Sequence, residues 1–70
     1  MVLEKWIQRL LGLIRELPLG YRTVFNLNVI EGYTHREIGE MLNISENTSK
    51  SQLSRAKRAI QKKLDRLNNK

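Results

Sequence analysis

Apolar residues recur at intervals of three and four along most of this 70-residue chain, which is the period of amphipathic helices. The first predicted helix covers Val2–Glu16. Its apolar stripe comprises Leu3, Trp6, Ile7, Leu10, Leu13, Ile14 and Leu17. The helix ends before Pro18, because a residue that precedes proline avoids the helical region. We expect the whole stripe, Trp6 included, to pack in the core rather than to stack on bases.

A second helix is predicted from Leu19 to Glu31. Its apolar face comprises Tyr21, Val24, Phe25, Leu27, Val29 and Ile30. Several of these residue types also favour strands. We predict a helix because the sequence offers no second strand for pairing. Gly32 follows where a left-handed helix cap is expected.

A short third helix begins at Thr34 or His35 and ends at Leu42. Thr34 and Glu37 match the T-x-x-E pattern of a capping box, in which each residue satisfies a free backbone N–H. The positions expected to face inward are Ile38, Met41 and Leu42.

The junction after this helix has the residues of a tight turn. Gly39 lies inside the helix, where glycine costs about 1 kcal/mol relative to alanine. We therefore expect another helix to pass too close for a side chain there. Asn43 suits a left-handed turn residue, and Ile44 would fill the corner between the helices.

A long fourth helix, Glu46–Asn68, is predicted behind Ser45 as N-cap. Its inward stripe comprises Leu53, Ala56, Ile60, Leu64 and Leu67. The spacing of Gly39, Asn43 and the two flanking helices is typical of a helix-turn-helix at about residues 34–58. The predicted fold is all-α: residues 1–70 form one domain, a small bundle of about four helices.

The positive charge is concentrated on the fourth helix. Residues 1–44 hold five Lys or Arg and five Asp or Glu, whereas residues 45–70 hold eight and two, so the net charge of +6 lies in the second segment. Such asymmetry indicates a polyanionic partner that meets one end of the molecule. A solvated basic helix without a partner is the alternative reading of charge alone.

Catalytic and metal-binding chemistry finds no support in the residues. The chain has no cysteine, and His35 is its single histidine, so a protein-ligated metal site is not expected. We expect His35 to be an ordinary surface residue rather than a phosphate contact. No residue pattern predicts an enzyme or a cofactor. The apolar N-terminal segment is too short and too interrupted to span a bilayer, so we expect no membrane association. The absence of cysteine is compatible with a reducing, intracellular setting, and the expected location is the cytoplasm.

In a helix-turn-helix the second helix enters the major groove by its N-terminal end. Its exposed N-terminal residues would be Glu46, Asn47, Thr48, Lys50, Ser51, Gln52, Ser54 and Arg55. Lysine and arginine can bind guanine O6 and N7, and glutamine can bind adenine. The basic residues farther along are expected to face phosphates or solvent: Lys57, Arg58, Lys62 and Lys63.

The stretch 17–64 resembles region 4 of bacterial sigma factors and is most similar to the extracytoplasmic-function class. The resemblance is carried by L-P-x-x-x-R-x-V-F, by E-G-x-T, and by T-x-K-S-x-L-x-R-A-K. The matching positions are Leu17, Pro18, Arg22, Val24, Phe25, Glu31, Gly32, Thr34, Glu37, Ile38, Glu40, Leu42, Ser45, Thr48, Lys50, Ser51, Leu53, Arg55, Ala56 and Lys57. The departures are Gly39 for alanine, Asn43 and Asn47 for glycine, and Ser49 for valine.

The resemblance implies binding to the promoter −35 element within RNA polymerase holoenzyme. It places Lys50, Ser51 and Arg55 near bases, and Arg22, Thr34 and Lys57 near phosphates. With the residues from the helix pattern, the expected DNA-binding set is Arg22, Thr34, Asn47, Thr48, Lys50, Ser51, Gln52, Ser54, Arg55, Lys57 and Arg58.

Protein partners are implied as well: the polymerase beta-subunit flap and, commonly in this family, an anti-sigma factor. A protein-interaction module with negligible DNA affinity of its own is the alternative function. We expect a monomer. Region 2, which a complete sigma factor needs, is not represented, so we expect a domain of a longer protein rather than a stand-alone regulator.

Overall fold

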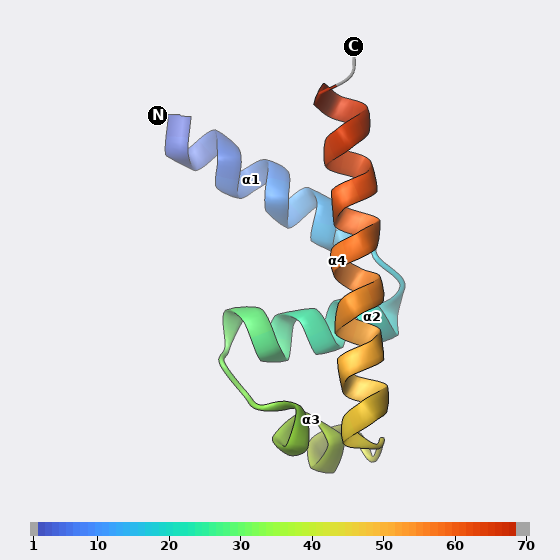
Figure 1. Cartoon of the computed structure of the whole chain (residues 1–70). Helices are drawn as coiled ribbons and strands as arrows, with labels where there is room; N and C mark the ends of the chain where they lie inside the picture. The colour runs from blue at the N-terminus through green and yellow to red at the C-terminus, as the bar shows by residue number, and fades with distance from the viewer. Residues whose placement is uncertain (1, 69–70) are drawn as a thin grey trace.

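The computed structural model describes residues 2–68, with the side chains of residues 2, 3, 6 and 68 left aside. Its elements are α1 (Val2–Arg15), α2 (Leu19–Phe25), the π-helical segment η1 (Asn26–Ile30), α3 (His35–Leu42) and α4 (Glu46–Asn68). No strand occurs among the described residues, so the all-α prediction is confirmed. Helix α4 packs against α1, α2 and α3, and α2 and α3 lie along its N-terminal half (Figure 1).

The core is a single cluster to which α1, α2, α3 and α4 all contribute. Its buried residues are Leu13, Ile14, Leu17, Val24, Phe25, Ile38, Leu53, Ala56 and Ile60. Ile38 at the centre has an exposed fraction of 0%. All nine were predicted to face inward, which confirms the helical periods on which those predictions rest.

The predicted apolar stripe of α1 is buried only at its C-terminal end. Ile7 is 50% exposed, and Leu10 is exposed as well; Leu3 and Trp6 lie outside the described side chains. The prediction that Ile7 and Leu10 are core residues is therefore wrong. Figure 1 shows the reason: α1 diverges from α4 toward its N-terminus, so the stripe extends beyond the helix that could cover it. The last apolar position of α4, Leu67, is exposed for the same reason.

The second helix forms as predicted but widens into a π-turn at Asn26. The Glu31 amide donates to the Asn26 carbonyl at 3.0 Å, a five-residue spacing. A π-turn shifts the angular position of the residues that follow it. Val29 is accordingly 50% exposed, and Ile30 is exposed, although both were predicted on the apolar face. Gly32 has φ +83°, which confirms its left-handed conformation.

Side chains cap both helices of the helix-turn-helix. The Thr34 hydroxyl accepts from the Glu37 amide at 3.1 Å, and the Thr34 amide donates to the Glu37 carboxylate at 3.0 Å. The hydrogen bond from the Thr34 backbone, with a smaller effect of its hydroxyl, lowers the pKa of Glu37 below its usual 4.5. Ser45 caps α4 by accepting from the Thr48 amide at 2.9 Å. Both predicted caps are confirmed.

Helix α3 buries a narrower face than its sequence predicts. Ile38 and Gly39 are buried, whereas Met41 is 51% exposed and Leu42 is also exposed. The inward placement of Met41 and Leu42 was therefore wrong. Helix α3 has only eight residues and contacts η1 and α4.

The turn between α3 and α4 is set by backbone contacts. Asn43 has φ 57° and ψ 47°, the predicted left-handed conformation, and the Ile44 amide donates to the Gly39 carbonyl at 2.9 Å. A Cβ on Gly39 would lie 2.7 Å from the Ile44 carbonyl oxygen. The nearest neighbour of Gly39 is therefore the backbone of the turn. The first residue of α4 also lies close, since the Glu46 amide nitrogen would be 3.5 Å from the same Cβ, so the expected close approach is confirmed but comes from the turn and the start of α4. The same contact explains why glycine is used.

Replacement of Gly39 by leucine should lower the free energy of unfolding by at least about 2 kcal/mol, because the side chain must displace backbone atoms. Gly12→Leu is the matched control. It lies inside α1 with no atom within 4 Å of an added Cβ, and should gain up to about 1 kcal/mol of helix propensity. Urea unfolding of both variants measures the difference. Equal stabilities would contradict the proposed role of the turn backbone.

Candidate nucleic-acid interface

The first turns of α4 expose a row of short polar and basic side chains. Inward positions of this segment are held by Ser49 and Leu53, which are buried. The exposed members of the predicted DNA-binding set are Asn47, Thr48, Lys50, Ser51, Ser54, Arg55, Lys57 and Arg58. The short residues around Lys50 and Arg55 leave the helix backbone accessible, as an approach to a nucleic-acid groove requires.

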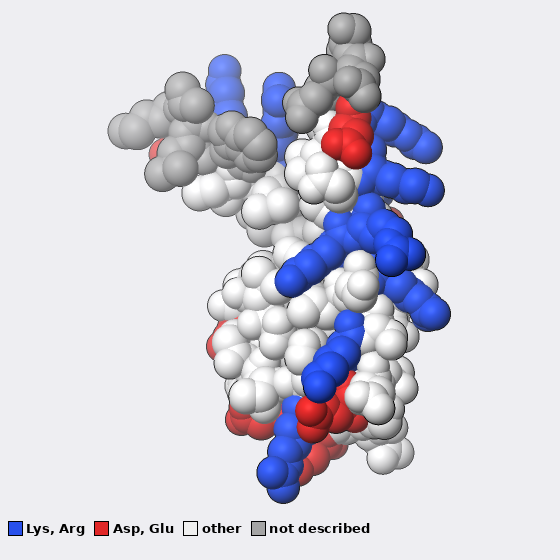
Figure 2. Space-filling view, viewed as in Figure 1, with Lys and Arg blue, Asp and Glu red and all other residues white. Residues whose placement is uncertain are grey.

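The N-terminal end of α4 carries mixed charge. Lys50 pairs with Glu46 at 3.3 Å, both on the exposed surface, and Arg36 of α3 lies 4.0 Å from Glu40. Figure 2 shows acidic and basic side chains interspersed at this lower end of the molecule. Exposed ion pairs such as these contribute little stability, so Lys50 can exchange Glu46 for another partner at small cost.

Most described cations in the middle of α4 are unpaired, Lys63 excepted. Within residues 2–68, Arg55, Lys57 and Arg58 form no ion pair or hydrogen bond, and neither does Lys62. In Figure 2 mostly basic side chains project from the upper half of α4. The uncompensated positive charge thus begins at Arg55 and extends toward the C-terminus.

Besides Lys50, several residues of the predicted set are held by the protein itself. The Thr48 hydroxyl accepts from the Ser45 hydroxyl at 2.8 Å. Thr34 uses its hydroxyl in the α3 cap. Arg22 donates from Nη1 to the Arg15 carbonyl at the end of α1, at 3.2 Å. Gln52 is half-buried, and its Oε1 atom has no partner among the described residues. In this conformation Arg22, Thr34 and Thr48 hydrogen-bond within the protein, whereas Gln52 is half-buried with an unsatisfied oxygen. The DNA contacts of all four side chains stay predictions.

A hydrogen bond that sequence reasoning missed joins the two helices of the motif. The Nδ1 atom of His35, in the first turn of α3, lies 2.8 Å from the hydroxyl of Ser49 on α4. The Ser49 side chain is 0% exposed and His35 is half-buried, so His35 is not the ordinary surface residue that was expected. The available signal was Ser49 itself, a polar residue at an inward position of α4.

The burial of Ser49 indicates which of the two side chains donates the hydrogen bond. Among the described residues its hydroxyl has no hydrogen-bond partner other than His35. A buried hydroxyl proton without an acceptor costs free energy, so the hydroxyl donates to Nδ1. The proton of neutral His35 then resides on Nε2, which leaves an N–H donor on the other side of the ring.

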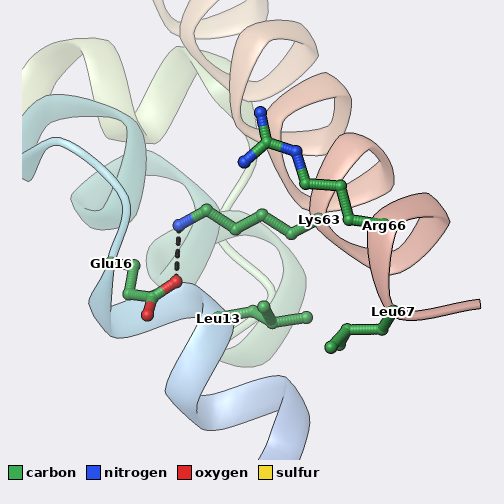
Figure 3. A pocket seen from close by; sticks show the side chains of 5 residues that line it. All are labelled: Leu13, Glu16, Lys63, Arg66 and Leu67. Atoms are coloured by element: carbon green, nitrogen blue, oxygen red, sulfur yellow. Dashed lines mark hydrogen bonds and ion pairs between the residues drawn. The ribbon is translucent and has the colours of Figure 1, made fainter. Parts of the chain in front are cut away.

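A cleft of about 290 Å³ lies between the end of α1 and the C-terminal part of α4. Leu13, Glu16, Lys63, Arg66 and Leu67 line it (Figure 3). Lys63 donates to the Glu16 carboxylate at 2.7 Å across the base of the cleft. Sequence reasoning did not find this cleft, because its walls are far apart along the chain.

No group of three or more potential metal-binding residues occurs in the described part of the chain. No described helix has the length and apolarity needed to cross a membrane.

A helix-turn-helix whose second helix carries the positive charge defines a class of DNA-binding domains. Comparison with family models gives a match to "Sigma-70, region 4" over residues 7–60. The chain therefore belongs to the sigma-70 region 4 family, whose members are DNA-binding domains without enzymatic activity. Searches of curated proteins and of solved structures gave no match.

Removal of the His35 side chain should lower stability by about 1–3 kcal/mol, because the buried Ser49 hydroxyl loses its acceptor. Ser49→Ala should cost less, since the half-buried imidazole can bind water. The His35→Ala/Ser49→Ala double variant should therefore lose less free energy of unfolding than the two single variants lose together. Urea unfolding should give a coupling energy of about 1 kcal/mol.

Arg36→Ala is the control for replacing a helical residue by alanine, because Arg36 is the exposed neighbour of His35. This variant should change the free energy of unfolding by less than about 0.5 kcal/mol. Strictly additive effects of His35→Ala and Ser49→Ala would contradict the coupling.

Proposed function

We propose that this chain binds the promoter −35 element as the region 4 domain of an RNA polymerase sigma factor and so directs transcription initiation. The observation that carries the proposal is a helix-turn-helix of this family whose second helix, α4, exposes Lys50, Arg55, Lys57 and Arg58. Region 4 has this role in sigma factors. Such a function takes place in the bacterial cytoplasm.

The side chains divide between base reading and backbone binding. Lys50 and Arg55 would donate to guanine O6 and N7, and Ser51 between them would contact a base edge. Asn47, Thr48, Ser54 and, after a rotamer change, Gln52 would approach bases or the sugar-phosphate backbone. Lys57, Arg58, Arg22 and Thr34 would contact phosphates.

A second function, docking on RNA polymerase, is favoured by the exposed apolar residues of α1 and α4. Leu10 lies one helical turn before Leu13, on the stripe that leads into the cleft, and Leu67 lines the opposite wall. Such a V-shaped apolar surface suits an amphipathic helix of a partner. We assign it to the beta-subunit flap; an anti-sigma factor would compete for the same surface.

A duplex with a matching −35 element should bind the isolated chain more tightly than a random duplex does. If about five phosphates are neutralised, log K should fall against log salt with a slope near −4 to −5. Fluorescence anisotropy at several salt concentrations measures both quantities. Equal affinity for the two duplexes, or no binding at low salt, would leave the docking function as the activity of this chain.

Glu46→Gln should raise DNA affinity about two- to fivefold, because it frees Lys50 and removes a negative charge next to the DNA. Glu40→Gln breaks the comparable pair with Arg36 at the far end of α3 and removes the same charge. It is the control and should have the smaller effect. If both variants gain affinity equally, the change reflects net charge, and Lys50 is not a base-reading residue.

Leu10→Glu and Leu67→Glu should each weaken binding to a purified beta-flap fragment by at least about tenfold, as expected for buried apolar anchors at an interface. Val29→Glu introduces the same charge at an exposed apolar residue of η1, outside the cleft. This control should bind the flap like the wild type in calorimetric titrations. A loss shared by all three variants would contradict docking in the α1–α4 cleft.

A further inference from the structure

A second pocket, between α2 and α4, has the composition of an anion site. Its volume is about 240 Å³, and its lining residues are Tyr21 of α2 with Arg55, Arg58, Ala59 and Lys62 of α4. Three of these five residues are basic, namely Arg55, Arg58 and Lys62, and none is acidic. The phenol of Tyr21 makes no hydrogen bond among the described residues, so it adds a free donor to the lining.

The three cations share one side of α4 by their spacing. Arg55 and Arg58 are three residues apart, and Lys62 follows four residues later, so the side chains stack along one helix face. Like charges at such intervals repel one another in the free protein. The described cations that do have acidic partners, Arg36, Lys50 and Lys63, lie elsewhere. A bound anion would relieve this repulsion.

Donor type and pocket size together select the ligand. Two guanidinium groups offer planar pairs of N–H donors that match phosphate oxygens, and an ammonium adds a point charge. Pockets for drug-sized ligands measure about 300–1,000 Å³, and this one is smaller. A phosphate group fits these limits better than a complete nucleotide does.

We propose that Tyr21, Arg55, Arg58 and Lys62 form a phosphate-binding pocket, and that its phosphate comes from the backbone of the DNA duplex that α4 enters. The source of the phosphate rests on the proposed function, whereas the pocket does not. Arg55 belongs both to this pocket and to the base-reading set. A phosphate held there would orient Arg55 and limit how deeply α4 enters the groove.

Titration with inorganic pyrophosphate, at ionic strength held constant with sodium chloride, tests the pocket without DNA. In two-dimensional NMR the amide signals of Tyr21, Arg55, Arg58 and Lys62 should shift and saturate. Arg58→Gln/Lys62→Gln should raise the dissociation constant about tenfold, as loss of charge-assisted hydrogen bonds predicts. Lys5→Gln/Arg9→Gln, exposed on α1, removes the same charge and should bind pyrophosphate like the wild type.

Titration with the −35 duplex then identifies the source of the phosphate. If the duplex supplies it, the salt slope of the Arg58/Lys62 variant should be smaller by about 1 than that of the Lys5/Arg9 control. The duplex should also displace pyrophosphate from the wild type. Pyrophosphate that stays bound beside the duplex would support the pocket but assign it to a free phosphorylated compound.

The pocket proposal would be overturned if pyrophosphate shifted the amide signals no more than chloride does. It would also be overturned if pyrophosphate bound the Arg58/Lys62 variant and the Lys5/Arg9 variant equally tightly. This result is independent of the proposed function, because it requires no DNA. Conversely, a wild-type chain that binds pyrophosphate in the pocket but shows no affinity for duplex DNA would contradict the proposed function alone.

Discussion

The contact between Gly39 and the carbonyl oxygen of Ile44 is the constraint on which the DNA-binding geometry depends. A Cβ at Gly39 would lie 2.7 Å from that oxygen, and Asn43 turns the chain there with a left-handed backbone. The direction in which α4 leaves α3 follows from this turn. The His35–Ser49 hydrogen bond then joins the same two helices one turn away, at 2.8 Å. Together they make α3 and α4 one rigid unit.

Positive charge is distributed unevenly along α4. Its N-terminal end presents short polar residues and a Lys50 already paired with Glu46, so little net attraction arises there. The unpaired cations begin at Arg55 and continue to Lys62. The attraction for a polyanion is therefore strongest from Arg55 onward, and under the proposed function Arg55 combines this attraction with base reading. The other proposed cationic base reader, Lys50, must first exchange its weak ion pair with Glu46.

The divergence of α1 from α4 gives the molecule a second surface. Leu13, Ile14 and Leu17 hold the end of α1 in the core, and the Lys63–Glu16 ion pair closes the base of the cleft. Beyond this point both helices expose apolar residues that no other part of the described chain covers. A chain of 70 residues buries a smaller fraction of its surface than a large domain does, so not every apolar face is covered. The exposed apolar residues at the open end of the cleft, such as Leu10 and Leu67, suit contact with a partner.

Local features of the molecule could be predicted from the sequence, because each depends on residues a few positions apart. The capping box, the Ser45 cap, the left-handed residues Gly32 and Asn43, and the bounds of α4 are of this kind. The nine core residues were predicted as well. The extent of burial was not, since Ile7 and Met41 follow the helical period but have no neighbouring helix to cover them. Contacts such as His35–Ser49 and Lys63–Glu16, and the two pockets, join segments far apart along the chain. Only the packing of the helices decides them, because a side chain's partner depends on which surface the fold brings to it.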